Sequence, residues 1–283
     1  MQKIIFCLLV CVTLTASGID WKGYHSAKTL EKEKRYDEAI AVYEKLSDAT
    51  ANEKDDQQYM LWAIAAANSK KDPATAKRLA ERVKNPQRRQ LVLMTIQKPA
   101  EIITAAGNID FMTYPEDIRG EAFARRGSAY FRLRQYDQAL NDFNKALSLP
   151  GANSQAGWAA RYAGWICRTR KQTEQAEKYF RKALTISNAN FAWRNESVID
   201  LSALLIAQKR AADACKIFES VKALNAMRGY WGIKMNTAYA EALISADKKL
   251  EALKVLDHLL QMVPEKDKAK IKKQIDTLSQ DML

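Results

Sequence analysis

The sequence predicts an all-α fold, a solenoid of stacked helical hairpins. Alanine recurs with a near-constant period, and apolar residues follow each copy four and seven positions later. These spacings place all three residues on one face of a helix. A mostly small residue stands twelve positions before each alanine, so one period holds a helix, a short turn and a second, antiparallel helix. Ten glycines and six prolines in 283 residues are too few for a loop-rich all-β protein.

The recurring alanines define six hairpins. They are Ala39, Ala76, Ala139, Ala176, Ala214 and Ala252, and their successive spacings along the chain are 37, 63, 37, 38 and 38. A near-constant period in this range is typical of helical-hairpin solenoids. The positions twelve earlier are Ala27, Ile64, Gly127, Gly164, Ser202 and Ala240. Five of these six are small, so we expect the two helices of most hairpins to approach closely.

Residues 1–18 have the layout of a secretory signal peptide. Lys3 precedes an apolar stretch that runs from Ile4 to Leu14, and Ala16-Ser17-Gly18 fits a small-x-small cleavage site. The alternative is an anchor helix, which would need about 18 apolar residues to span a membrane. We therefore expect export to the periplasm or the exterior, and we expect no transmembrane span.

The period also divides the remainder of the chain into segments. Hairpins 1 and 2 occupy residues 19–86, and hairpins 3 to 6 occupy residues 120–264. The one long spacing exceeds the regular one by less than a full period, so we expect an irregular or degenerate hairpin at residues 87–119. In residues 265–283 apolar side chains recur at helical spacing among lysines. This pattern predicts a C-terminal helix that caps the stack.

At these positions the sequence resembles the tetratricopeptide repeat family. The residues that carry the resemblance are Gly127, Tyr130, Tyr136-Asp137-Gln138-Ala139, Phe143, Ala146 and Pro150, then Tyr36-Asp37-Glu38-Ala39 with Tyr43, and Ala163-Gly164 with Ala176, Phe180 and Ala183. The resemblance covers residues 20–86 and 120–264. It implies a right-handed superhelix that binds peptides or proteins, mostly on its concave face.

The sequence shows no constellation of catalytic or metal-binding residues. The two histidines, His25 and His258, are far apart and lack companion ligands. No glycine-rich phosphate loop or nucleophile motif is present. We therefore predict no enzymatic activity, no cofactor and no metal. Cys167 and Cys215 both fall in apolar helical patterns; they are interpreted as buried thiols, and a disulfide between them is the alternative.

The charge distribution points to one candidate surface. The chain carries a net charge of +12, and residues 119–182 hold thirteen Lys or Arg against five Asp or Glu. Within this segment a stripe at helical spacing combines aromatic and arginine side chains. Its residues are Trp158, Arg161, Trp165 and Arg168, joined by Phe131 and Arg132 of the preceding hairpin. By the resemblance, this stripe faces the concave groove. The alternative is that the tryptophans pack against neighbouring helices under the arginine stems.

These features predict a non-enzymatic scaffold or assembly adaptor outside the cytoplasm that binds a protein or peptide segment in a basic, aromatic groove. Aromatic residues and arginine are enriched in binding hot spots. An acidic segment and an anionic envelope polymer are the two partners that fit the positive charge; export disfavours nucleic acid. The alternative function is a helical subunit of an enzyme that processes an envelope polymer, glycan or peptidoglycan, or a module that binds one.

Overall fold

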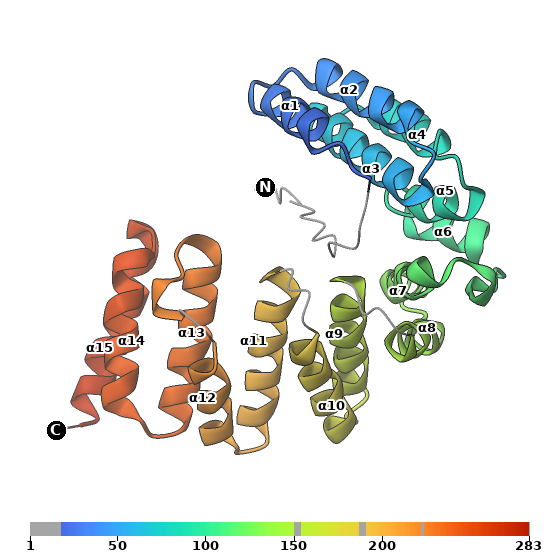
Figure 1. Ribbon diagram of the computed structural model, residues 1–283. Helices are drawn as coiled ribbons and strands as arrows, with labels where there is room; N and C mark the ends of the chain where they lie inside the picture. The colour runs from blue at the N-terminus through green and yellow to red at the C-terminus, as the bar shows by residue number, and fades with distance from the viewer. Residues whose placement is uncertain (1–17, 150–153, 187–190, 222–223, 283) are drawn as a thin grey trace. The chain divides into compact units, whose positions relative to one another are not determined.

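The computed structural model describes residues 18–149, 154–186, 191–221 and 224–282 (Figure 1). These residues form fifteen α-helices and two short 3-10 helices, with no strand among them. The predicted all-α class, built of stacked helical hairpins, is therefore confirmed. The predicted leader lies outside the described residues except for Gly18. Among the described helices, none is both long and apolar enough to cross a membrane.

The chain forms two compact units, which divide between Ala159 and Ala160. The helices of the N-terminal unit are α1 (Trp21–Lys32), α2 (Tyr36–Ala49), α3 (Glu53–Lys70), α4 (Pro73–Glu81), α5 (Pro86–Leu93), α6 (Pro99–Ala106), η1 (Phe111–Thr113), α7 (Glu116–Arg132) and α8 (Tyr136–Ser148). Helix α9 (Ser154–Thr169) contains the division. Each unit has a core of its own, and each is described by itself.

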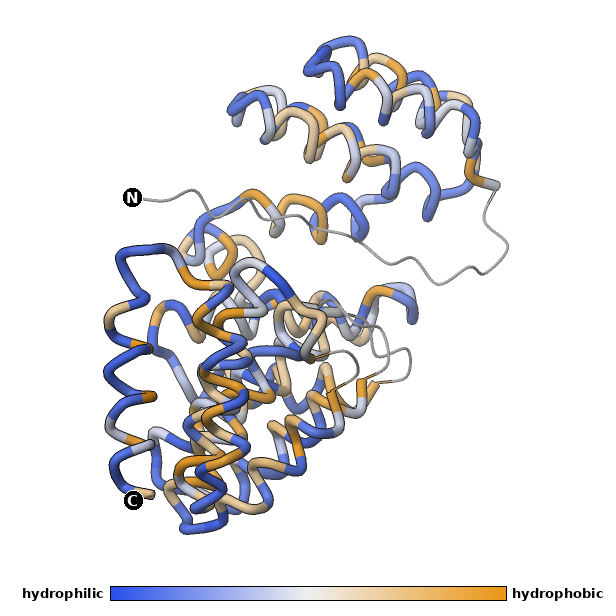
Figure 2. The backbone as a smooth tube through the Cα atoms, turned by 90° about the vertical axis from the view of Figure 1, so that its left-hand side faces the viewer, coloured by the Kyte–Doolittle hydropathy of each residue, from blue (hydrophilic) through white to orange (hydrophobic). Residues whose placement is uncertain are grey.

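The C-terminal unit continues the alternation of longer and shorter helices. Its helices after α9 are α10 (Thr173–Thr185), α11 (Phe191–Ala207), α12 (Ala211–Glu219), η2 (Leu224–Ala226), α13 (Gly229–Ser245), α14 (Lys249–Met262) and α15 (Glu265–Gln280). Apolar and hydrophilic residues alternate along the helices (Figure 2). This alternation is expected of helices that bury one face.

The predicted seam of small side chains lies in the core. All six recurring alanines are at most 1% exposed, and the residues twelve positions earlier are buried as well. In two hairpins an aromatic ring fills the space above a glycine. A Cβ on Gly127 would lie 2.8 Å from the ring of Phe143, and one on Gly164 would lie 2.7 Å from the ring of Phe180. The absence of a Cβ is therefore what lets the second helix bring its ring against the first.

Each of the six hairpins turns through a residue in the left-handed region. These residues are Lys34, Lys71, Arg134, Lys171, Lys209 and Asp247, with φ between 58° and 63°. Each stands five positions before a recurring alanine. The next backbone N–H reaches back to close the first helix; for example, Arg35 donates to the Leu30 carbonyl at 2.9 Å and Gln135 to the Tyr130 carbonyl at 2.9 Å. This is the Schellman pattern, which satisfies carbonyls at a helix end.

The segment predicted to be irregular, residues 87–119, is built around two short helices and a 3-10 turn. Prolines begin both helices: Pro86 starts α5 and Pro99 starts α6. Proline suits the first turn of a helix because a backbone N–H at that position would have no acceptor within the helix, so its absence loses no hydrogen bond. Pro86 and Pro99 therefore both lie in the first turn of a helix, and α5 begins one residue before the predicted start of the irregular segment.

Arg126 of α7 fastens this segment to the hairpin that follows. Its Nη1 donates to the carbonyls of Ala106 at 2.9 Å and Ile109 at 2.7 Å, while its Nε and Nη2 donate to Asp142 of α8 at 2.7 and 2.9 Å. The guanidinium also lies 4.5 Å from the ring centroid of Phe111. The side chains of Arg126 and Asp142 are only 8% and 2% exposed. One buried cation therefore ties α6, η1, α7 and α8 together.

Cys167 and Cys215 are buried free thiols. Burial raises the pKa of both thiols above the ordinary value. The interpretation as small apolar core residues is therefore the one that the structure supports.

The glycine seam yields a paired prediction on one helix. Gly127→Ala should destabilise the N-terminal unit by about 1–3 kcal/mol, because the added methyl overpacks against Phe143. Gly120→Ala should leave stability unchanged or raise it by up to about 1 kcal/mol, because its nearest contact would be an ordinary 3.6 Å and alanine favours the helix. Urea unfolding followed by circular dichroism measures both, and equal shifts would contradict the seam.

The buried ion pair yields a second prediction. Arg126→Met should cost about 3–5 kcal/mol of unfolding free energy, because it leaves the Asp142 carboxylate buried and unpaired. The double variant Arg126→Met/Asp142→Leu should recover much of this loss, since it removes the stranded charge. A double variant as unstable as the single one would show that the backbone contacts of Arg126, and not the charge, carry the effect.

Candidate protein-interaction surfaces

The residues of the predicted groove lie at the ends and along the faces of two first helices of hairpins. Phe131 and Arg132 end α7, where the Phe131 ring lies 5.8 Å from that of Tyr136 and Arg132 is exposed. The other four, Trp158, Arg161, Trp165 and Arg168, lie on α9 and are all partly exposed. Trp158 belongs to the N-terminal unit and the last three to the C-terminal unit. That all six line one groove stays a prediction.

In the C-terminal unit the stripe on α9 faces two carboxylates of α11. Arg161 Nη1 lies 2.5 Å from Glu196 Oε2, and its Nε donates to Asp200 Oδ2 at 2.8 Å. Arg168 Nη1 lies 3.6 Å from Asp200 Oδ1. Glu196 and Asp200 are four positions apart and therefore share one face of α11. The two arginines thus meet two acids from the first helix of the next hairpin.

This arrangement changes what the stripe presents to a partner. The side chains of Arg161 and Asp200 are 17% and 14% exposed, so their pairing is partly shielded from water. An acidic ligand would have to compete with Glu196 and Asp200 for Arg161. Arg168, at 34% exposed and with a longer contact, is the more available of the two cations. The arginines of the stripe are therefore paired with carboxylates of α11, and tryptophan side chains lie on the same helix as these arginines.

Sequence reasoning missed the two carboxylates, although a signal was present. Asp200 follows Arg161 at a sequence separation of 39, close to one repeat period, and so falls on the equivalent helix of the next hairpin. Opposite charges at a separation of one period are candidates for pairing between adjacent first helices. The charge count of residues 119–182 stopped short of Glu196 and Asp200 and therefore overstated the local excess of positive charge.

A second surface that the sequence analysis did not single out lies on α1 and α3. Tyr24 contacts Trp62 with ring centroids 4.3 Å apart, and Trp21 meets Tyr24 edge-on at 5.6 Å. His25 lies 5.3 Å from Tyr24. Trp21 is 44% exposed. On α1 the three rings lie at spacings of three and one, and Tyr24 connects them to Trp62 of α3. We call Trp21, Tyr24, His25 and Trp62 the aromatic ladder.

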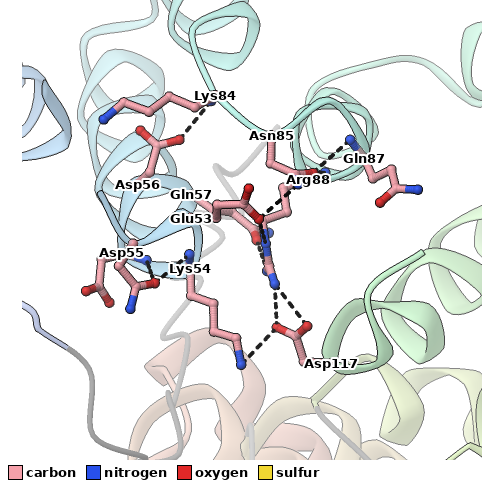
Figure 3. Close-up of polar contacts among 11 residues, drawn as sticks. Glu53, Lys54, Asp55, Asp56, Gln57, Lys84, Asn85, Gln87, Arg88 and Asp117 are labelled. Carbon is pink, nitrogen blue, oxygen red and sulfur yellow. Dashed lines mark hydrogen bonds and ion pairs between the residues drawn. The ribbon is translucent and has the colours of Figure 1, made fainter. Parts of the chain in front are cut away.

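A polar cluster at the start of α3 is structural in character (Figure 3). Arg88 of α5, 4% exposed, donates to Gln57 at 2.8 Å and to both carboxylate oxygens of Asp117 at 2.9 Å. Lys54 adds a contact to Asp117 at 3.6 Å. These bonds join α3, α5 and α7 within the N-terminal unit. Both oxygens of Asp117 meet the same nitrogen, Nη2, and this charge-assisted contact is stronger than one between neutral groups.

The described residues hold no group of His, Cys, Asp or Glu side chains placed to bind a metal ion. The polar groups named above are engaged with one another, and their contacts hold helices together. What the surfaces offer chemically is aromatic area and paired charge, which suit the binding of a protein segment.

Comparison with known proteins identifies the repeat. Family models of the tetratricopeptide repeat match residues 24–52 and 120–189. In these two segments the chain matches the tetratricopeptide repeat. The two matches fall on α1–α2 and on α7–α10, where the Gly127 seam and the left-handed turns also lie. No curated protein matches the chain at a significant level.

Solved structures of proteins with tetratricopeptide repeats match the chain, and the first of the two described here shows a similar fold. One is a signal transduction ATPase with a tetratricopeptide repeat sensor from Pyrococcus horikoshii, at 14% identity and a TM-score of 0.60, covering 90% of this chain and 44% of that one. Another is a tetratricopeptide repeat protein from Parabacteroides merdae, at 15% identity and a TM-score of 0.44, covering 91% and 98%. The chain thus spans less than half the length of the first of these proteins.

The ion pairs of α9 and α11 yield a prediction about stability. Arg161→Met should lower the unfolding free energy by about 1–3 kcal/mol, because it removes the arginine from two partly buried carboxylates and leaves Asp200 only the longer contact to Arg168. Arg181→Met is the matched control in the same unit. Arg181 is 49% exposed and its partner Glu177 keeps Arg210, so about 0.5 kcal/mol or less is expected. Thermal unfolding of the two variants measures the difference, and equal losses would contradict the assignment.

Proposed function

We propose that the protein is a non-enzymatic scaffold outside the cytoplasm that binds a protein or peptide segment along the first helices of its hairpins. The repeat fold is compatible with such a role. The observation that carries the proposal is that the first helices α1, α3 and α9 keep tryptophans partly exposed at Trp21, Trp62, Trp158 and Trp165. Tryptophan supplies a large contact area with few rotatable bonds, and it is enriched at binding hot spots.

All six residues predicted for the groove remain in this proposal, but the role that we propose differs from one residue to another. Trp158, Trp165 and Phe131 supply contact area. Arg132 and Arg168 are the cations on offer to a ligand, whereas Arg161 positions α9 against α11. In the N-terminal unit the proposed binding residues are Phe131, Arg132 and Trp158, and in the C-terminal unit they are Arg161, Trp165 and Arg168.

Export is the second component of the proposal and rests on the leader pattern of residues 1–18. Outside the cytoplasm the partners in reach are exported proteins and envelope polymers. A protein segment is favoured over an anionic polymer because the α9 stripe is charge-paired. A polymer site would need a row of cations free to meet repeated negative charges.

The binding test compares two variants of the exported protein as baits. Trp158→Ala/Trp165→Ala should lose at least tenfold in capture of crosslinked partners in the native compartment, read by mass spectrometry. Leu250→Ala is the control, because Leu250 is 66% exposed on α14 and lies outside the proposed surface. Arg161→Glu is unsuitable as a probe, since it would place three carboxylates together and destabilise the unit. Unchanged capture by the folded tryptophan variant would remove the α9 surface from the proposal.

The salt dependence of binding separates the two classes of partner. Capture of a protein segment through aromatic contacts should change less than threefold when salt is raised, because paired charges respond weakly to screening. Binding of an anionic polymer should fall steeply over the same range. A steep fall, with polymer recovered in place of a protein, would overturn the proposed partner class.

A further inference from the structure

Asp55, in the first turn of α3, has a buried carboxylate oxygen without a partner. The residue is 2% exposed, and its Oδ2 makes no hydrogen bond within the described part of the chain. Its neighbour Asp56 is satisfied, because it accepts from Ser47 Oγ at 2.5 Å and from the Lys84 backbone N–H at 2.8 Å. An unpaired buried carboxylate is costly. Asp55 therefore calls for a cation that the internal contacts do not supply.

Asp55 points away from the arginine cluster on the other side of α3 (Figure 3). Residues two apart on a helix differ by about 200° in direction, so Gln57 meets Arg88 while Asp55 faces elsewhere. The lysines near this helix end have other partners. Lys54 lies 3.6 Å from Asp117, and Lys84 Nζ donates to the Ser47 carbonyl at 2.7 Å.

What lies against Asp55 is the start of the described chain. A substituent on the Cα of Gly18 would lie 3.3 Å from Asp55 Oδ2. The next two residues are held to α3: Ile19 is 7% exposed, and the Asp20 backbone N–H donates to Tyr59 Oη at 2.7 Å. Asp20 also caps α1 by accepting from the Gly23 N–H at 3.0 Å. Ile19 and Asp20 are thus fixed beside Asp55, directly after the predicted cleavage site.

We propose that removal of the leader leaves Ile19 as the first residue, and that its new α-ammonium forms an ion pair with Asp55. A leader peptidase hydrolyses the Gly18–Ile19 bond with one water, leaving a carboxylate on Gly18 and an ammonium on Ile19. The ammonium arises at the place that Gly18 leaves, next to Asp55 Oδ2. The pair locks the mature N-terminus onto α3, so processing and the final packing of hairpin 1 are coupled. This inference rests on the export component of the proposed function.

The test varies the position of the α-ammonium and the charge of residue 55, and it measures the unfolding midpoint of each resulting protein. The first form begins at Ile19, and the second begins at Ala16 and so carries its ammonium further along the chain from Asp55; both are released from a cleavable fusion. Asp55→Asn should lower the unfolding midpoint of the Ile19 form by about 2–4 °C and should not lower that of the Ala16 form. Asp56→Asn is the control and should lower both midpoints equally, because Ser47 and Lys84 are its partners in either form.

The outcomes separate this inference from the export proposal. Mass spectrometry of the exported protein should find Ile19 as the first residue; a start at Gly18 places the ammonium on the adjoining residue and also supports the pair. A mature chain that starts beyond Asp20 would overturn the inference. So would equal effects of Asp55→Asn in the two forms, even if export and cleavage occur. A protein retained in the cytoplasm with residues 1–18 attached would overturn the export component itself.

Discussion

The close approach of two helices within each hairpin is the constraint on which the structure depends. Where the first helix offers glycine, as at Gly127 and Gly164, the second inserts a phenylalanine ring into the space where a Cβ would stand. Where it offers alanine or serine, as at Ala27, Ser202 and Ala240, those side chains are buried to the same degree. Neither helix of a hairpin is stable alone, since each buries its apolar face against the other helix and against the neighbouring repeat.

The close approach also fixes the turn. The two helices can meet at this separation only if the chain reverses within a few residues, and each of the six turns does so through one left-handed residue. Five of these residues are Lys or Arg and one is Asp, although glycine would adopt this conformation with less strain. The five positive side chains stand just past the C-termini of their first helices, where a cation is favoured by the helix dipole. Solubility at the turn and stabilisation of the helix end therefore offset the backbone cost.

The sequence could predict the parts of the fold that repeat. Spacing alone was enough to find the recurring alanines, their small partners and the terminal amphipathic pattern, because the same contact between two helices recurs in all six hairpins. The left-handed turns could not be read as such, since lysine and arginine are not turn signals. The sequence predicts that the segment of residues 87–119 is irregular, but its organisation depends on Arg126 reaching the distant carbonyls of Ala106 and Ile109. No local pattern specifies contacts of that kind.

The candidate site was harder to predict than the fold, for a reason that follows from repetition. In a stack of hairpins, a side chain on one first helix faces the equivalent helix one period later, so charge has to be counted across neighbouring repeats. Counted along the chain, Arg161 belongs to a basic segment. Counted across the stack, it is neutralised by Glu196 and Asp200. Aromatic contact area does not depend on charge, and the tryptophans of α1, α3 and α9 are all partly exposed, so the pairing of the arginines leaves this area in place. A solenoid can thus carry a large net charge and still recognise its ligand mainly through rigid apolar surface.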